Sequence, residues 1–140
     1  MEPYIIEFPK ILDPRGNLTF AEEDSQIPFA VRRVYWIYDV PGGEYRGAHA
    51  FKETEEVIIA LSGSFDVVLN DGNQEHVFQL NRSYFGVYVP KMYWRKLENF
   101  SSNSLAAIIA STDYREKDYI SDFELLKKIR KDEKNVVKDR

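Results

Sequence analysis

The stretch from Arg46 to Val57, RGAHAFKETEEV, contains a residue that can move protons near neutral pH. The imidazole of His49 has an unperturbed pKa of about 6.5, which suits a general base. Phe51 follows two positions later, on the same face of a strand, where a second histidine would complete a metal clamp. Because a phenyl ring carries no ligand atom, the stretch favours proton transfer by one imidazole without a metal.

The spacing around His49 resembles the first cupin motif, in which a glycine, a His-x-His pair, a glutamate and a closing glycine follow one another. The corresponding residues are Gly43, His49, Phe51, Glu56 and Gly63. The segment PKMYWR resembles the second cupin motif, with Arg95 where that family places its third metal-binding histidine. An arginine brings a permanent positive charge to that place, so we expect no metal and hypothesise a Glu56–Arg95 ion pair in the vacated space.

A more specific resemblance is to the nucleotide-sugar 3,4-ketoisomerases, metal-free cupins whose substrate is dTDP-4-keto-6-deoxyglucose. It covers roughly residues 5 to 125 and is carried by RRVYWIYDV, RGAHAFKETEEVIIALSGSFDVVLNDG, FGVYVP, YWRKLENFS and ASTDYREKDYI. The family typically has a second histidine and a glutamine where this chain has Phe51 and Glu56. The resemblance implies a cupin jelly roll, a homodimer with exchanged N-terminal strands, and a role in deoxysugar and cell-surface polysaccharide biosynthesis.

The chemistry that the resemblance implies can be carried by His49. A ketone at C4 of the sugar acidifies the C3 proton, and its removal gives an enediol. Returning a proton at C4 leaves the carbonyl at C3 without consuming a redox cofactor. Alternation in VRRVYWIY places Arg33 and Tyr35 on one face, which makes Tyr35 the candidate partner of His49.

The substrate's pyrophosphate calls for the forked donors of arginine, and its base or sugar for an aromatic ring. The candidate substrate-binding residues are Arg15, Arg33, Arg46, Glu56, Tyr88, Trp94 and Arg95. Alternation places Arg46 opposite to His49, so Arg46 reaches the site only if a bulge or the strand start rotates it. Purely structural roles remain open for Tyr35 and Trp94 as core residues and for Arg15 as a solvated turn residue.

The elements that must position these residues are mostly strands. Short β-rich runs with turn signals between them continue to about Ser111, and NDGN at 70–73 indicates a tight hairpin. Near the C-terminus Ile120, Phe123, Leu126 and Ile129 recur at spacings of three, which predicts one amphipathic helix. We therefore predict an all-β jelly-roll barrel with one C-terminal helix, and an open sandwich as the competing architecture.

The composition limits the classes of partner. A chain of 140 residues predicts one domain, 1–140, and 19 Lys and Arg against 23 Asp and Glu leave no basic field for nucleic acid. No apolar run approaches the roughly 20 residues of a membrane span, and no cysteine is present, so the expected location is the cytoplasm.

Two hypotheses from different classes remain open on the sequence. The first is the metal-free 3,4-ketoisomerase with His49 as base, and a sugar epimerase would share its enolisation step. The second is a nucleotide-sugar binding protein that has lost or altered catalysis through Phe51 and Glu56.

Overall fold

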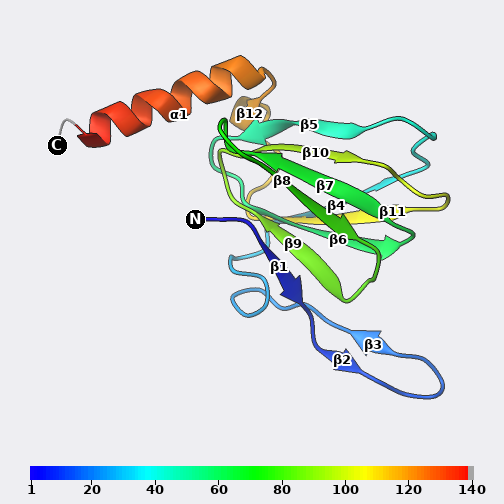
Figure 1. Cartoon of the computed structure of the whole chain (residues 1–140). Helices are drawn as coiled ribbons and strands as arrows, with labels where there is room; N and C mark the ends of the chain where they lie inside the picture. The colour runs from blue at the N-terminus through cyan, green and yellow to red at the C-terminus, as the bar shows by residue number, and fades with distance from the viewer. Residues whose placement is uncertain (139–140) are drawn as a thin grey trace.

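Two antiparallel five-stranded sheets face each other in the computed structural model, which describes residues 1–138 (Figure 1). The first sheet has the order β1-β9-β6-β11-β4, with bounds Tyr4–Glu7, Phe85–Val89, Glu56–Ser62, Leu105–Ala110 and Arg33–Tyr38. The second has the order β12-β5-β10-β7-β8, with bounds Tyr119–Ile120, Arg46–Phe51, Trp94–Glu98, Phe65–Asn70 and Glu75–Leu80. The predicted all-β jelly roll is confirmed. In the described residues no ladder joins the two sheets, so the barrel consists of two facing sheets.

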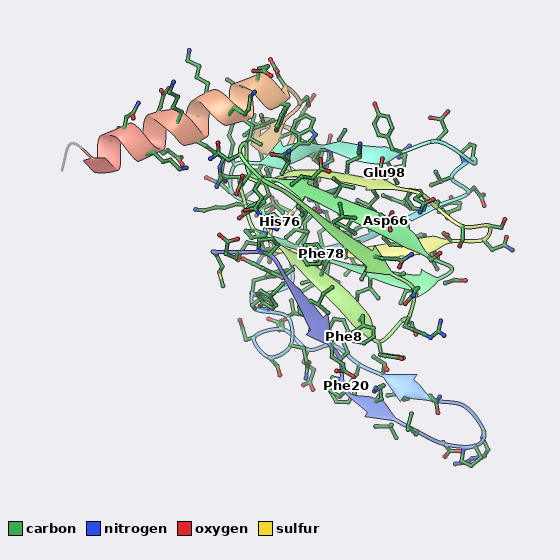
Figure 2. The ribbon with its side chains drawn as sticks, in the orientation of Figure 1. Phe8, Phe20, Asp66, His76, Phe78 and Glu98 are labelled. Atoms are coloured by element: carbon green, nitrogen blue, oxygen red, sulfur yellow. The ribbon has the colours of Figure 1, made fainter. Side chains whose placement is uncertain are left out.

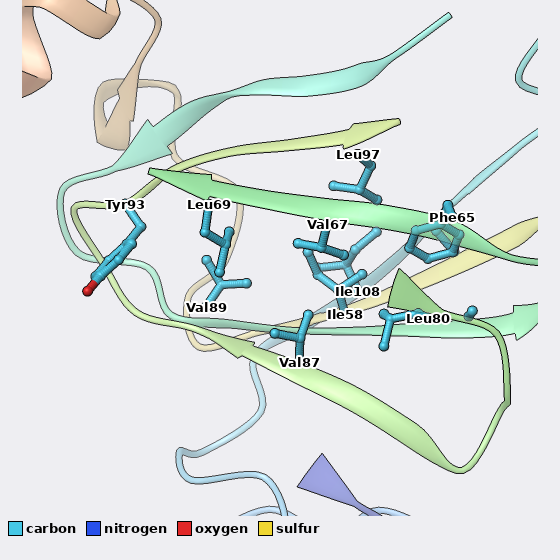
Figure 3. Packing of buried hydrophobic residues seen from close by; sticks show 12 residues of the cluster. Ile58, Phe65, Val67, Leu69, Leu80, Val87, Val89, Tyr93, Leu97 and Ile108 are labelled. Atoms are coloured by element: carbon cyan, nitrogen blue, oxygen red, sulfur yellow. The ribbon is translucent and has the colours of Figure 1, made fainter. Parts of the chain in front are cut away.

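The main core lies between the two sheets and follows from strand alternation. Ile58, Val87 and Ile108 of the first sheet point toward Val67 and Leu97 of the second, as Figure 3 shows. All five are buried, and burying one such aliphatic side chain stabilises the fold by about 1.5–3 kcal/mol. The core therefore holds the two sheets at a fixed separation, and polar side chains that point inward have fixed neighbours.

The predicted hairpin at NDGN joins β7 to β8. The side chain of Asn70 accepts a hydrogen bond from the backbone N–H of Gly72 at 2.7 Å, which closes the turn locally. Figure 2 shows His76 and Phe78 on the β8 side of this hairpin.

The predicted C-terminal helix is α1, Phe123–Lys138. It begins where the Asp122 side chain accepts a hydrogen bond from the backbone N–H of Glu124 at 2.9 Å. Its apolar residues Phe123, Leu126 and Ile129 pack against the outer side of the second sheet. The prediction was wrong for Ile120, which lies in β12 and pairs with Ala50, because the cap at Asp122 starts the helix only after it.

Two features lie outside the packed body. The hairpin of β2 (Lys10–Ile11) and β3 (Leu18–Thr19) projects away from the sheets in Figure 1. Strand β4 is an edge of the first sheet, and its outward side chains, which include Trp36 at 61% exposure, are open to solvent.

A short 3-10 helix, Glu116–Asp118, precedes β12. Among the described residues, no helix combines the length and apolarity that crossing a membrane requires.

Candidate active site

Three polar side chains from three strands meet between the sheets. Arg95 of β10 forms an ion pair with Glu56 of β6, and its Nη2 donates a hydrogen bond to the hydroxyl of Tyr35 on β4 at 2.6 Å. The Tyr35 hydroxyl in turn donates to Glu56. Arg95 and Glu56 are 1% and 0% exposed. The predicted Glu56–Arg95 ion pair is confirmed, and within the described residues no three His, Cys, Asp or Glu side chains group as metal ligands.

Burial shapes the protonation of this cluster. Burial works against the charged form of Arg95, but Glu56 and Tyr35 outweigh it and raise the pKa of Arg95 above its ordinary value. Burial, together with Glu56 and against the effect of Arg95, raises the pKa of Tyr35 far above its usual range. Tyr35 therefore keeps its proton, and the cluster presents a neutral hydroxyl beside a permanent cation.

The cluster changes the roles expected for Glu56 and Arg95. The sequence suggested that both contact substrate, but their charged groups are fully buried and occupied by each other. A pyrophosphate could reach Arg95 only by breaking that pair, which costs more than an exposed arginine would. Glu56 and Arg95 instead hydrogen-bond to the Tyr35 hydroxyl and fix its position.

His49 lies on β5 directly opposite Arg95, because the two residues are Cα partners in the β5–β10 ladder. Its Nε2 atom is buried and has no hydrogen-bond partner among the described residues. Burial first, and then the positive charges of Arg95 and Arg33, lower the pKa of His49 to about 3. The imidazole is therefore neutral at physiological pH. His49 and Tyr35 are connected through Arg95, which is the ladder partner of His49 and donates a hydrogen bond to the Tyr35 hydroxyl.

A bulge in β5 brings Arg46 to the face of His49. In the ladder, His49 is opposite Arg95 and Arg46 is opposite Leu97. From one pair to the next, β5 therefore advances by three residues while β10 advances by two, which is a bulge. Gly47 makes this possible with φ of +73°, a conformation that side chains disfavour, and a Cβ there would collide with the Arg95 guanidinium. The bulge that the sequence left open is present. Arg46 is exposed and lines a cavity of about 370 Å³ with residues 36–41.

Arg33 lies on the same inward face of β4 as Tyr35, as alternation predicts. Its guanidinium carbon is 5.3 Å from the Tyr35 ring centre and 5.8 Å from that of Tyr114. The Nε of Arg33 is buried without a hydrogen-bond partner in the part of the chain that the structure describes. A partly buried cation with an unused donor suits an anionic group of a ligand.

Three candidates from the sequence do not meet His49 within this chain. The Arg15 side chain is 90% exposed on the β2–β3 hairpin, where it pairs with Asp13 at 2.9 Å. Tyr88 packs in the cluster outside the first sheet and donates a hydrogen bond to Glu55. Trp94 packs against α1, because alternation that turns Arg95 inward turns its neighbour outward.

Two aromatic residues that were not among the candidates join the site. The ring centre of Tyr119, on β12, is 4.8 Å from that of His49, and Tyr114 borders Arg33. Both lie in ASTDYREKDYI, a string that already carried the family resemblance. Its position about 65 residues after His49 hid the contact, because only the β12–β5 pairing brings the two segments together.

Comparison with known proteins gives this site its context. The model of the FdtA family, described as WxcM-like, C-terminal, matches residues 1–131. The chain belongs to the FdtA family. It is 42% identical over 128 residues to a TDP-4-oxo-6-deoxy-alpha-D-glucose-3,4-oxoisomerase from Aneurinibacillus thermoaerophilus, covering 91% of this chain and 92% of the relative.

Solved structures agree with this FdtA-family assignment. A 3,4-ketoisomerase from Helicobacter canadensis superposes with a TM-score of 0.90 at 38% identity, over 94% of this chain and 98% of that one. A mutant of the 3,4-ketoisomerase QdtA from Thermoanaerobacterium thermosaccharolyticum, in complex with TDP-4-keto-6-deoxyglucose, superposes with a TM-score of 0.90 at 32% identity, over 93% and 94%. A dTDP-4-dehydrorhamnose 3,5-epimerase from Bacillus anthracis, at 16% identity and a TM-score of 0.75 over 84% of this chain and 77% of that one, shares the fold.

The buried ion pair predicts an asymmetric response to mutation. Arg95→Met leaves the Glu56 charge buried without a partner, so the free energy of unfolding should fall by about 3–5 kcal/mol. The double variant Arg95→Met with Glu56→Leu should lose less, because no charge is left alone. Urea denaturation measures both, and Arg115→Met, which removes an exposed pair with Asp113, should cost at most about 1 kcal/mol. A double variant less stable than Arg95→Met would contradict this account.

The lowered pKa of His49 predicts a pH dependence of stability. In the unfolded chain a histidine binds its proton at about pH 6.5, whereas folded His49 binds it near pH 3. Between these values the unfolded state holds the extra proton, so the free energy of unfolding falls as the pH drops from 7 toward 4. In His49→Gln this contribution is absent, and urea titrations at pH 7 and 5 should show a smaller loss. Equal losses in both proteins would refute the assignment.

Proposed function

We propose that this chain, as a single domain spanning residues 1–140, is a 3,4-ketoisomerase of a dTDP-4-keto-6-deoxyhexose. The observation that carries the proposal is the buried, unpartnered Nε2 of His49, opposite the Arg95–Tyr35 pair. The relative with 42% identity is named for the same reaction, and a QdtA structure is named as a complex with the keto sugar. The cytoplasmic location expected from the sequence stays a prediction.

In the proposed reaction His49 carries the proton in both steps. Neutral Nε2 takes the proton from C3 of the sugar, and the C3–H electrons form the C3–C4 double bond of an enediolate. The imidazolium then returns the proton to C4, the carbonyl forms at C3, and the C3 hydroxyl proton passes to the C4 oxygen, which becomes the new hydroxyl. The Tyr35 hydroxyl, positioned by Arg95, donates its one proton to Glu56 in this structure, and on substrate binding it would turn that proton toward the oxygen that gains charge.

Substrate binding strengthens this base. Burial lowers the pKa of His49 most, and the positive charges of Arg95 and then Arg33 lower it further. A diphosphate held by Arg33 and Arg46 offsets the Arg33 part of this effect, so the pKa of His49 rises when the substrate is bound. The proposal therefore couples recognition of the nucleotide diphosphate to activation of the base.

The proposed enzyme is a homodimer that exchanges its N-terminal strands, which places Arg15 in the partner's site. Arg15 sits on a hairpin that projects from its own body, where its partner is Asp13 alone among the described contacts. The edge strand β4 exposes Trp36, Tyr38 and Val34, an apolar face that a second copy would cover. Exchange would give Arg15 an anionic ligand and remove the exposed face from water.

One observation favours a second candidate, a nucleotide-sugar binding protein with altered catalysis. Phe51 occupies the place where the related ketoisomerases typically carry a second histidine, so a proton relay through two imidazoles is not available. Tight dTDP binding without exchange at C3 is the outcome that this candidate predicts. The epimerase alternative has the fold alone in its favour, since the matching epimerase is 16% identical.

Proton exchange at C3 tests the proposal directly. Incubation of the protein with dTDP-4-keto-6-deoxyglucose in heavy water should give remaining substrate with deuterium at C3 and a 3-keto product with deuterium at C4, both visible by NMR. His49→Asn should lower the rate by about 10²–10⁴-fold, because general acid–base catalysis contributes that much. His76→Asn on β8 is the matched control and should keep the wild-type rate. Product formation by His49→Asn at the wild-type rate would contradict the role of His49.

Subunit complementation tests the exchanged dimer. Arg15→Ala and His49→Asn homodimers should each be weakly active, for different reasons. Mixed by co-expression, they should form heterodimers in which one site has both Arg15 and His49 intact, so part of the wild-type activity returns. Activity that stays at the sum of the two homodimers would show that Arg15 does not act across the interface.

A further inference from the structure

Two aromatic rings, those of Phe51 and Tyr119, pack against the proposed base. The centres of His49 and Phe51 are 4.9 Å apart with an interplanar angle of 80°, which is an edge-to-face contact. Tyr119 lies 4.8 Å from His49 and 4.7 Å from Phe51. Each of the three rings therefore contacts the other two, and Phe51 and Tyr119 pack against two sides of the imidazole.

Strand pairing and hydrogen bonds fix the backbone around the rings of His49, Phe51 and Tyr119. Tyr119 is the Cα partner of Phe51 in the β12–β5 ladder. The neighbouring Asp118 is buried, and its carboxylate accepts hydrogen bonds from the backbone N–H groups of Glu53 at 2.7 Å and Thr54 at 3.1 Å. These bonds fix the segment before β12 to the end of β5. Phe51 is 3% exposed, so it has little freedom to change rotamer.

The imidazole lacks the usual means of orientation. A catalytic histidine is commonly held by a hydrogen bond from one ring nitrogen to a carboxylate or carbonyl, which also fixes its tautomer. The Nε2 of His49 has no such partner among the described residues, and the carboxylate of Glu56 is occupied by Arg95 and Tyr35. The Arg95 guanidinium carbon lies 5.6 Å from the Phe51 ring centre, so Phe51 also lies against the cation of the buried pair.

We propose that Phe51 is a positioning residue for His49: its edge-to-face contact, closed by Tyr119, sets the plane of the imidazole and keeps Nε2 free to face the sugar. This inference rests on the proposed function and deepens it. A histidine at this position would place a second donor, acceptor and titrating group against the base. Phenylalanine orients the ring through packing alone, and the proton has no second imidazole to move to.

The proposal predicts a loss in turnover rather than in binding. Phe51→Leu keeps an apolar side chain in the buried position but removes the ring edge, so a smaller share of molecules holds His49 in the productive orientation. The expected result is a kcat about 10-fold lower, because small misplacements of a catalytic group are costly, with KM changed less than about 2-fold. Phe78→Leu on β8, a partly buried phenylalanine of the main core, is the matched control and should keep the wild-type kcat.

The imidazole itself supplies a readout that needs no turnover. The chain has two histidines, so the ¹⁵N signals of His49 can be assigned with His76→Asn. In the wild-type protein the His49 ring protons should show one fixed set of NOEs to Tyr119, which marks a single orientation of the imidazole. In Phe51→Leu these NOEs should weaken and average, because the imidazole then samples more than one rotamer. Phe51→His should instead add a titration step near pH 6 to the kcat profile, because the introduced imidazole contacts the base.

The outcomes separate this inference from the proposed function. If the wild-type protein catalyses no C3 exchange, the proposed function fails, while the NMR comparison of ring orientation still decides whether Phe51 orients His49. The inference is overturned if Phe51→Leu retains both the wild-type kcat and a single imidazole orientation. It is equally overturned if Phe51→Leu and Phe78→Leu lower kcat to the same extent, because the effect would then be a general loss of packing.

Discussion

The buried ion pair between Arg95 and Glu56 is the interaction on which the rest of the site depends. It joins β10 to β6 across the space between the sheets, and it fixes the Tyr35 hydroxyl from β4 in the same network. Two charges at 1% and 0% exposure are tolerated only because each compensates the other. The pair also explains Gly47, because the Arg95 guanidinium leaves no room for a Cβ on the neighbouring strand.

The same cation sets the electrostatics of the base. Arg95 is opposite His49, and with burial and Arg33 it keeps the imidazole neutral. Tyr35 keeps its proton because burial and Glu56 oppose its ionisation. A neutral base and a neutral donor therefore sit beside a fixed positive charge, an arrangement that suits a reaction whose intermediate is an anion. This arrangement lowers the stability of the fold, because it holds charged groups where water cannot solvate them.

The position of α1 and the segment before it completes the site from outside the sheets. Asp118 ties that segment to Glu53 and Thr54, and β12 then adds Tyr119 to the edge of β5. The helix packs over Met92 and Trp94, on the other side of the strand that carries Arg95. Elements that the sequence presents as a C-terminal addition thus support the two strands that carry His49 and Arg95.

The sequence by itself determined the all-β class, the C-terminal helix, the inward face shared by Arg33 and Tyr35, and the pairing of Glu56 with Arg95. The first three follow from local periodicity, which is a property of short stretches, whereas the Glu56–Arg95 pair was a hypothesis from the resemblance to the two cupin motifs. Only the tertiary structure decided that a bulge sets Arg46 opposite Leu97, that Tyr88 faces away from His49, and that Tyr119 joins His49. The physical reason is that a bulge at Gly47 and the β12–β5 pairing depend on contacts between distant segments. Local patterns do not contain those contacts, because strand register is chosen by the packing of the whole sheet.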